Sequence, residues 1–394
     1  MRLRRFTLVL VAAAMTLTAV PAVAWSSPVV LDGAGGANGR LDAPIGWDTA
    51  AVLHGGVRHV FYSAIVNGRH RLRHASLSAS PTFETLDGAG GTSGRTTHDV
   101  GSDLSASVFG GVMHVFYRDD TSGNLRHGWR EGSTWRFETL DGASTVGGRV
   151  SSNVGRRSVT ATFRRKLVVL YLDVARADVR LASYAGSGWS FTTIDGDSTA
   201  AGHTIHEVGY NVQAKVWGGA LHVVYYERDP AYGAELGWVR EARFDGVEWR
   251  YSRAFRVNTI VLGKSLALGV VASDEVYVAY NTTLQGDTRL RWRRWNGSTW
   301  SESSMLTGVF FGDISASVLF VVVGGVPTLA FSDQSTGDIE YFTWSGGEVT
   351  FQSVVGFTGS PTSALVIGDT TAHIFWGAGF TPSVDEVLFR TTGP

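Results

Sequence analysis

The chain has 394 residues, of which 49 are glycine and none is cysteine, and its 34 basic residues nearly balance 35 acidic ones. This balance argues against nucleic acid or an anionic membrane surface as the main partner, and the lack of cysteine excludes disulfide bonds and thiol-linked lipids. Abundant glycine together with 13 Trp, 12 Tyr and 20 Phe residues favours an all-β fold of many short strands and tight turns.

The beginning of the chain has the pattern of an export signal. A basic start (residues 2–5) precedes an apolar run over residues 6–19, and Ala-Val-Ala at 22–24 satisfies the small-residue rule for cleavage. The apolar run is too short for a membrane anchor, so we expect no membrane insertion. We therefore expect a secreted, bacterial and monomeric protein, cleaved after Ala24, whose residues 25–394 form one domain.

The rest of the sequence repeats itself with a period of roughly 50 residues. The tripeptide Leu-Asp-Gly or Ile-Asp-Gly begins at residues 31, 86, 140 and 194. A glycine also precedes the candidate first strand of each unit, at Gly46, Gly101, Gly155, Gly209, Gly263, Gly312 and Gly359. Each unit except the last holds four β-like runs, as in SASVFGG, VMHVFYRD, NLRHGWRE and TWRFETLDG. Seven such units predict a seven-bladed β-propeller of four-stranded blades.

The two ends of the chain complement each other. The last unit has only three β-like runs, whereas SPVVLDG (27–33) matches the fourth-strand pattern and has no unit of its own. We therefore expect residues 25–33 to supply the outer strand of the last blade. This closure removes two free sheet edges and ties the termini together without a disulfide.

The connections between units carry a recurring motif, Asp-Gly followed after five or six residues by Gly-Arg. It places three arginines on the face formed by the longer loops, namely Arg40, Arg95 and Arg149, and a histidine, His203, in the fourth copy. One interpretation is a crescent of arginines that holds an acidic or hydroxyl-rich ligand. The other is a structural loop that each arginine closes by pairing with the Asp of its own motif.

The residue after each marker glycine is expected where the innermost strand enters the central channel. The candidates for a polar ligand site at this channel mouth are Trp47, Arg156, Tyr210, Lys264 and Asp313, with Ser102 and Ser360 at the same position in the other units. An ordinary solvated rim is the alternative interpretation.

Three further candidates lie in the second unit, HVFYRDDTSGNLRHGWREGSTW. Arg118 and Asp119 stand where the second strand meets the longer loops. Trp129 takes a place that is polar in the other units, which indicates an exposed ring and a mild binding signal. It lies toward the opposite face.

Recognisable enzyme motifs are absent from the sequence. We find no nucleophile elbow, metal-binding motif or phosphate loop, and so expect neither metal nor cofactor. A glycosidase needs a pair of carboxylates, and nothing in the sequence pairs the acids. The histidines at 59, 114, 222 and 373 recur at one strand position, which favours structural packing.

The unit MHVFYRDDTSGNLRHGWREGSTW resembles the repeat of the fucose-binding propeller lectins of fungi and bacteria, and the number of units is similar to that of seven-bladed lectins from insect-pathogenic bacteria. The resemblance implies the propeller fold and favours glycan recognition. The arginine and glutamate that grip fucose in those lectins are not matched, because His114 and His127 stand there in unit two, and His59 and His74 in unit one.

These observations predict a non-enzymatic, lectin-like protein that binds a glycan or another cell-surface ligand through a propeller face or pockets between blades. One alternative is a protein-binding or envelope-associated propeller without sugar specificity. The other is a glycoside hydrolase or lyase with its site at the channel mouth, which a single asymmetric pocket with two carboxylates would favour.

Overall fold

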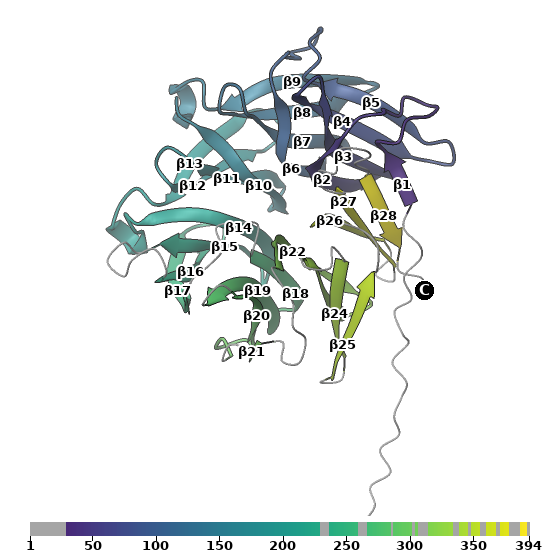
Figure 1. The fold of residues 1–394 in the computed structure, drawn as a ribbon. Coiled ribbons are helices and arrows are strands. Elements are labelled where there is room, and N and C mark those ends of the chain that lie inside the picture. The colour runs from purple at the N-terminus through teal and green to yellow at the C-terminus, as the bar shows by residue number, and fades with distance from the viewer. Residues whose placement is uncertain are drawn as a thin grey trace, which may run out of the picture.

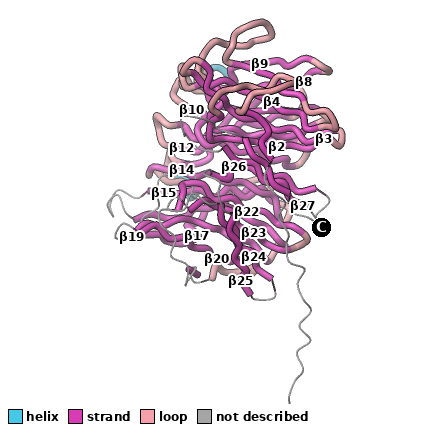
Figure 2. Tube along the Cα trace, turned by 45° about the vertical axis from the view of Figure 1, so that its right-hand side comes forward, coloured by secondary structure: helices cyan, strands magenta, loops and turns pink. Residues whose placement is uncertain are grey.

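The structure is a computed structural model that describes residues 29–228, 236–258, 266–284, 287–301, 304–305, 314–333, 339–345, 348–354, 360–367, 371–377 and 387–391. The described residues form seven four-stranded antiparallel sheets, which lie around a common centre as the blades of a propeller (Figure 1). Strands make up most of the tube in Figure 2, with the loops at their ends. The predicted all-β propeller fold is confirmed. The expected export signal lies outside the described residues.

Blades 1 to 4 follow one another along the chain, each with its strands in sequence order. Blade 1 contains β2 (Ile45–His54), β3 (Val57–Val66), β4 (Arg69–Leu77) and β5 (Thr82–Asp87). Blade 2 contains β6 (Val100–Phe109), β7 (Val112–Asp119), β8 (Asn124–Glu131) and β9 (Thr134–Asp141). Blade 3 contains β10 (Val154–Phe163), β11 (Lys166–Asp173), β12 (Asp178–Tyr184) and β13 (Trp189–Asp195). Blade 4 contains β14 (Glu207–Trp217), β15 (Ala220–Arg228), β16 (Leu236–Phe244) and β17 (Trp249–Asn258). Short 3₁₀ turns, η1 (Val146–Gly148) and η2 (Ala200–Gly202), lie in two of the connections.

Blade 5 contains β18 (Leu266–Ala272), β19 (Glu275–Leu284), β20 (Asp287–Trp295) and β21 (Ser304–Met305), and blade 6 contains β22 (Ile314–Val323), β23 (Val326–Asp333), β24 (Ile339–Ser345) and β25 (Glu348–Val354). Blade 7 joins β26 (Ser360–Ile367), β27 (Thr371–Gly377) and β28 (Val387–Thr391) to β1 (Val29–Asp32). β1 pairs antiparallel with β28, so the N-terminal strand closes the last blade as predicted. Among the described residues, no helix is long and apolar enough to cross a membrane.

The first two strands of several blades are joined by Gly-Gly turns. At Gly110 and Gly111 the backbone angle φ is 59° and 76°, and at Gly218 and Gly219 it is 55° and 76°. Two consecutive residues with positive φ form the turn whose twist matches antiparallel strands. These tight turns place the ends of the first two strands on one face, and leave the longer connections to the other.

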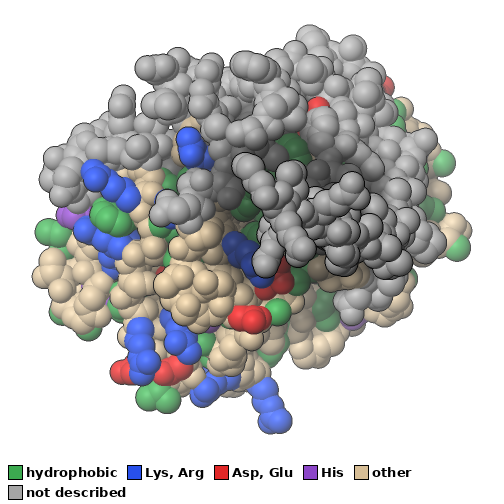
Figure 3. Space-filling view, turned by 90° about the horizontal axis from the view of Figure 1, so that it is seen from below, with side chains coloured by type: hydrophobic (Ala, Val, Ile, Leu, Met, Phe, Trp, Pro, Cys, Tyr) green, Lys and Arg blue, Asp and Glu red, His purple; other side chains and the backbone are tan. Residues whose placement is uncertain are grey.

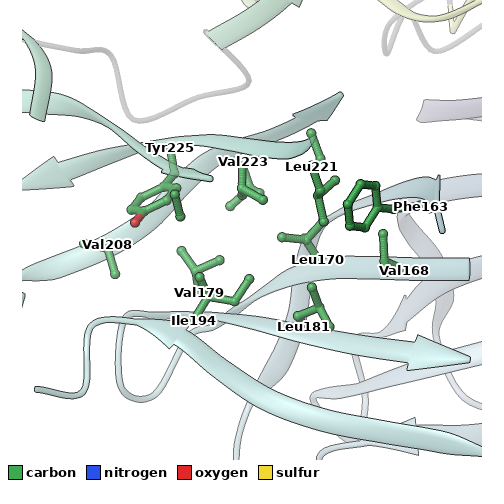
Figure 4. Packing of buried hydrophobic residues seen from close by; sticks show 13 residues of the cluster. Phe163, Val168, Leu170, Val179, Leu181, Ile194, Val208, Leu221, Val223 and Tyr225 are labelled. Atoms are coloured by element: carbon green, nitrogen blue, oxygen red, sulfur yellow. The ribbon is translucent and has the colours of Figure 1, made fainter. Parts of the chain in front are cut away.

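The hydrophobic core lies between the blades. In the cluster shown in Figure 4, Phe163, Val168 and Leu170 of blade 3 meet Leu221, Val223 and Tyr225 of blade 4. The second strand of each blade is covered on both sides. In Val112–Asp119, for example, seven residues in succession are buried. On the face in Figure 3, basic and acidic side chains of the described residues lie close together, and apolar ones are scattered.

A buried group that we call the interblade clasp joins each of the first blades to the one before it. Asp87, at the end of blade 1, accepts hydrogen bonds through Oδ2 from the Tyr117 hydroxyl (2.6 Å) and from Arg126 Nε (3.0 Å) of blade 2. Its Oδ1 accepts from the backbone N–H groups of Gly88 and Thr96. The same Asp–Tyr–Arg group recurs at Asp32–Tyr62–Arg73, Asp141–Tyr171–Arg180 and Asp195–Tyr225–Arg240.

The Gly-Arg end of the repeated loop motif also belongs to this interblade contact. A Cβ on Gly94 would lie 1.9 Å from the carbonyl oxygen of Phe137 in the next blade, so only glycine fits. The Gly94 carbonyl accepts a hydrogen bond from Arg126, and the guanidinium of Arg95 lies 5.8 Å from the centre of the Phe137 ring.

The structural interpretation expected each of the three motif arginines to pair with the Asp of its own loop. In the structure each arginine lies over an aromatic ring instead. Arg40 lies over Phe83 and Arg149 over Phe191, on the outermost strands of the next blades. Each motif Asp is instead occupied by backbone N–H groups and the clasp. These contacts give all three arginines a structural position at the outer rim.

Removing one member of the clasp is expected to destabilise the protein strongly. Tyr117→Phe deletes a hydrogen bond to a buried carboxylate and should lower the free energy of unfolding by about 1.5–3 kcal/mol. Arg126→Met leaves Asp87 buried beside an apolar group, and should cost about 3–5 kcal/mol. Urea denaturation measures both, with Arg136→Ala as the control, because Arg136 pairs with Glu131 at the exposed surface. Equal midpoints for Tyr117→Phe and the control would contradict this role.

The recurring strand histidines form buried hydrogen-bonded pairs. Nδ1 of His114 lies 2.9 Å from Nε2 of His127, and Nδ1 of His127 lies 2.9 Å from Oε1 of Glu138. His59 and His74 repeat the contact in blade 1. Burial, followed by the neighbouring histidine, lowers the pKa of both His59 and His114 to about 4. The structural interpretation of these histidines agrees with this packing.

This packing should make the fold sensitive to acid. A histidine that titrates near pH 6.5 when unfolded and about 4 when folded leaves the unfolded state with more protons in between. Stability is therefore complete above the unfolded pKa and decreases as the pH falls from about 6.5 toward 4. Blade 3 has Val168 and Leu181 at these positions, so His114→Val/His127→Leu should weaken the loss of Tm between pH 7 and pH 4.5. An identical pH dependence in the double variant would rule out the histidine pair as its source.

Candidate active site at the mouth of the central channel

The innermost strands are interrupted at the same place in successive blades. The pairing of β6 with β7 shifts register after Ser102, and that of β10 with β11 shifts after Arg156. The next residues, Asp103 and Arg157, have φ of 52° and 58°, and Asn211 in blade 4 has 58°. These are β-bulges, which re-aim a side chain that regular pleating would place elsewhere.

The bulges border a cavity of about 280 Å³ at the centre of the propeller. Asp48, Asp103, Arg157 and Asn211 line it from four adjacent blades. Farther along the strands the lining consists of small, hydroxyl and aliphatic side chains together with Gln213, Lys215 and Phe320. Because the bulges stand near the beginning of the innermost strands, this polar end of the cavity lies on the face of the longer loops. It is asymmetric, with two acids in blades 1 and 2, an arginine in blade 3 and an amide in blade 4.

The bulge side chains are linked from blade to blade. Asp48 Oδ2 accepts a hydrogen bond of 2.8 Å from the backbone N–H of Asp103, and Asp103 Oδ1 accepts one of 3.1 Å from the backbone N–H of Arg157. Burial raises the pKa of the Asp103 carboxyl above its usual range, and the nearby charge of Asp120 adds to this, although Arg157 opposes it. Asp103 is therefore protonated more readily than an ordinary aspartate.

Asp120 is a third carboxylate at this mouth. The Ser102 hydroxyl donates to Asp120 Oδ2 at 2.5 Å, and Arg118 Nε donates to Oδ1 at 2.8 Å. Arg118 is itself buried and donates through Nη1 to the carbonyl of Val154, where β10 begins. Arg118 thus fixes Asp120 between blades 2 and 3.

The sequence-based candidates are distributed unevenly around this cavity. Arg156 is exposed, and its charge acts on Asp103, so it stands at the mouth with Arg118. Tyr210 is partly buried and packs against the cluster between blades 4 and 5. The side chain of Trp47, and the whole of Lys264 and Asp313, lie outside the described residues.

Two other candidates take structural positions. Asp119 is buried, accepts backbone hydrogen bonds from Thr121 and Ser122 in the following turn, and contacts His98. The Trp129 ring is half-buried and stacks on His127 with ring centres 5.0 Å apart, away from the channel mouth.

The register identifies the residue of blade 4 that is equivalent to Trp129. Trp129 pairs with His114, and in blade 4 Arg243 pairs with His222 in the same way, so a polar residue stands there as expected. Arg240 is the clasp arginine of its blade.

Sequence reasoning missed Asp48, Asp103 and Asp120. The first two stand 55 residues apart, and Arg157 follows Asp103 by 54, so the repeat itself marks this position. The bulge moves the cavity-lining residue one place beyond the expected one. Among the described residues, no group of three or more His, Asp or Glu side chains is placed to hold a metal ion.

No protein-family model matches the chain, and no curated protein matches it. Solved structures do match. An α-L-arabinofuranosidase from Fusarium graminearum, in complex with an iminosugar inhibitor, has a TM-score of 0.51 and 11% identity over 93% of this chain and 98% of its own. A sialidase from Streptococcus pneumoniae has a TM-score of 0.45 and 9% identity over 89% of this chain and 68% of its own. An α-L-arabinofuranosidase from Podospora anserina, in complex with cellotriose, has a TM-score of 0.37 and 14% identity over 70% of this chain and 97% of its own.

The Fusarium structure corrects the interpretation of the chain as a non-enzymatic lectin, because the propeller that this chain resembles there, with a TM-score of 0.51, is that of an α-L-arabinofuranosidase. At identities this low the likeness shows the fold alone, so any activity has to be argued from the cavity. The propeller fold is retained, and the lectin family is not.

Proposed function

We propose that the protein is a carbohydrate-active enzyme that cleaves a glycosidic bond at the mouth of the central channel. The observation that carries this proposal is the pair Asp48 and Asp103, two carboxyl groups from adjacent blades on one asymmetric cavity. Glycosidic cleavage in most enzymes of this kind needs two carboxyl groups, one protonated and one ionised.

The different surroundings of the two groups assign their roles. Asp103, with its raised pKa, is the general acid, which gives its proton to the oxygen of the leaving sugar as the glycosidic C–O bond breaks. Asp48, which accepts a hydrogen bond from the backbone N–H of Asp103, takes the complementary role of general base. It takes a proton from the water that supplies a hydroxyl to the anomeric carbon.

The rest of the lining suits a polyhydroxylated ligand. Asn211 and Gln213 present amides, Ser158 and Thr160 present hydroxyls, and Arg157 presents a cation. Such groups can donate and accept hydrogen bonds to several sugar hydroxyls at once. The activity of the Fusarium enzyme makes aryl α-L-arabinofuranosides a reasonable first substrate, followed by a panel of other aryl glycosides.

Replacing the proposed acid should abolish most of the activity. Asp103→Asn keeps the shape but removes the transferable proton, so kcat/KM on a hydrolysed glycoside should fall about 10²–10⁴-fold. Arg149→Ala, at the outer rim, serves as the control and should retain activity. An active Asp103→Asn enzyme would refute the assigned role, and wild-type protein inactive on every glycoside of the panel would refute the proposed function.

The pH dependence of kcat/KM provides a second test of the role of Asp103. A purely structural role would leave this pH dependence unchanged. Asp120 raises the pKa of Asp103, so Asp120→Asn should lower it. Because the general acid works only when protonated, the alkaline limb of kcat/KM should move to lower pH in this variant. An unchanged alkaline limb, measured with full activity at acidic pH, would exclude Asp103 as the titrating acid.

A further inference from the structure

A second cavity, of about 350 Å³, lies between blades 4 and 5. Trp217, Glu241 and Arg243 line it from blade 4 together with Tyr251, and Trp295 and Trp300 line it from blade 5. It also includes residues of the short turns after β14 and β18 and after β20. It therefore lies on the face opposite to the channel mouth.

At the equivalent places of the earlier junctions, aromatic rings fill the space. Trp189 of blade 3 packs against His127 of blade 2 with ring centres 5.2 Å apart, and Trp135 of blade 2 packs against His74 of blade 1 at 5.6 Å. Tyr184 lies 6.1 Å from Phe109 across the same gap. In these junctions the tryptophan near the start of the outermost strand covers the neighbouring blade.

Between blades 4 and 5 this packing differs, and the clasp aspartate is replaced as well. Phe255 stands at the register position of the clasp aspartate, opposite Val239, as Asp195 stands opposite Val179. Its ring lies 5.5 Å from both Tyr280 and Trp300. Trp300 thus packs on Phe255, and at the position of His127 blade 4 has Glu241.

The lining combines aromatic surface with polar groups. Trp217 stacks on His222 with ring centres 3.4 Å apart, and the His222 ring bonds to Glu241 at 2.5 Å. Trp295 is half-buried beside Trp300, with ring centres 5.6 Å apart. Aromatic faces pack against the apolar C–H faces of a sugar ring, while carboxylate, guanidinium and serine groups at the edge bind its hydroxyls.

We infer that this cavity is an accessory sugar-binding site, which holds a unit of an oligosaccharide remote from the bond that the channel mouth would cleave. The inference takes its class of ligand from the proposed function and its position from the described residues. A proline-rich peptide also binds aromatic grooves, but Glu241, His222 and Arg243 on the lining suit hydroxyl groups better than prolines.

The test measures binding of arabino-, xylo- and cellohexaose to the full chain by tryptophan fluorescence and calorimetry. It is made with the wild-type protein and with the Asp103→Asn variant. Trp295→Ala should weaken Kd about tenfold or more for the hexasaccharide that binds, and Trp295→Phe should restore most of the affinity. Trp129→Ala is the matched control, because it removes another half-buried tryptophan away from this cavity.

Three results would overturn the inference: no hexasaccharide binding that depends on Trp295, an equal loss in Trp129→Ala, or binding of a polyproline decapeptide in place of the sugars. The two proposals fail separately. Trp295-dependent binding without hydrolysis of any glycoside leaves the accessory site and removes the enzyme. Asp103-dependent hydrolysis with affinity unchanged by Trp295→Ala leaves the enzyme and removes the accessory site.

Discussion

The interblade clasp is the interaction on which the regular part of this propeller depends. A buried aspartate at the end of one blade is shared by a tyrosine and an arginine of the next, and its other oxygen holds the connecting loop. Burying a carboxylate and a guanidinium is unfavourable unless each is fully hydrogen-bonded. All hydrogen bonds of the clasp can form only when adjacent blades meet in one register. The clasp therefore specifies the angle between blades, which a purely apolar interface would leave adjustable.

This fixed geometry explains how one repeated position can carry different chemistry. The innermost strands bulge at equivalent places, so the residues there meet at the channel mouth whatever their identity. Asp48, Asp103, Arg157 and Asn211 occupy that position in four blades. The fold brings the bulge residues together at the channel mouth, and the sequence places a different side chain there in each blade. The cavity is therefore asymmetric although the blades are alike. The junction of blades 4 and 5 departs from this regularity, since Phe255 takes the place of the clasp aspartate and a second cavity lies between the two blades.

The sequence predicted the fold well because the fold is encoded many times over. Each unit repeats the same apolar runs and glycine turns, and the fragment 27–33 could be assigned to the last blade because one strand was missing there. The clasp was also within reach, since Tyr62, Tyr117, Tyr171 and Tyr225 each follow a motif aspartate by 30 residues. The site residues were not, because Arg156 and Tyr210 were chosen as the residues directly after the marker glycines, and the bulge with positive φ moves the cavity-lining position one residue further along the chain.

Recurrence of a residue does not by itself mark a binding site. The Gly-Arg ends of the loops suggested a crescent of arginines that holds a ligand, and the structure places Arg40, Arg95 and Arg149 over phenylalanines of the next blade. A feature required at every interface tends to recur in every blade, whereas a binding group needs to be present only where the ligand is. In this molecule the informative residues are those that differ at equivalent positions. Asp103 against Arg157 marks the channel mouth, and Glu241 against His127 marks the second cavity.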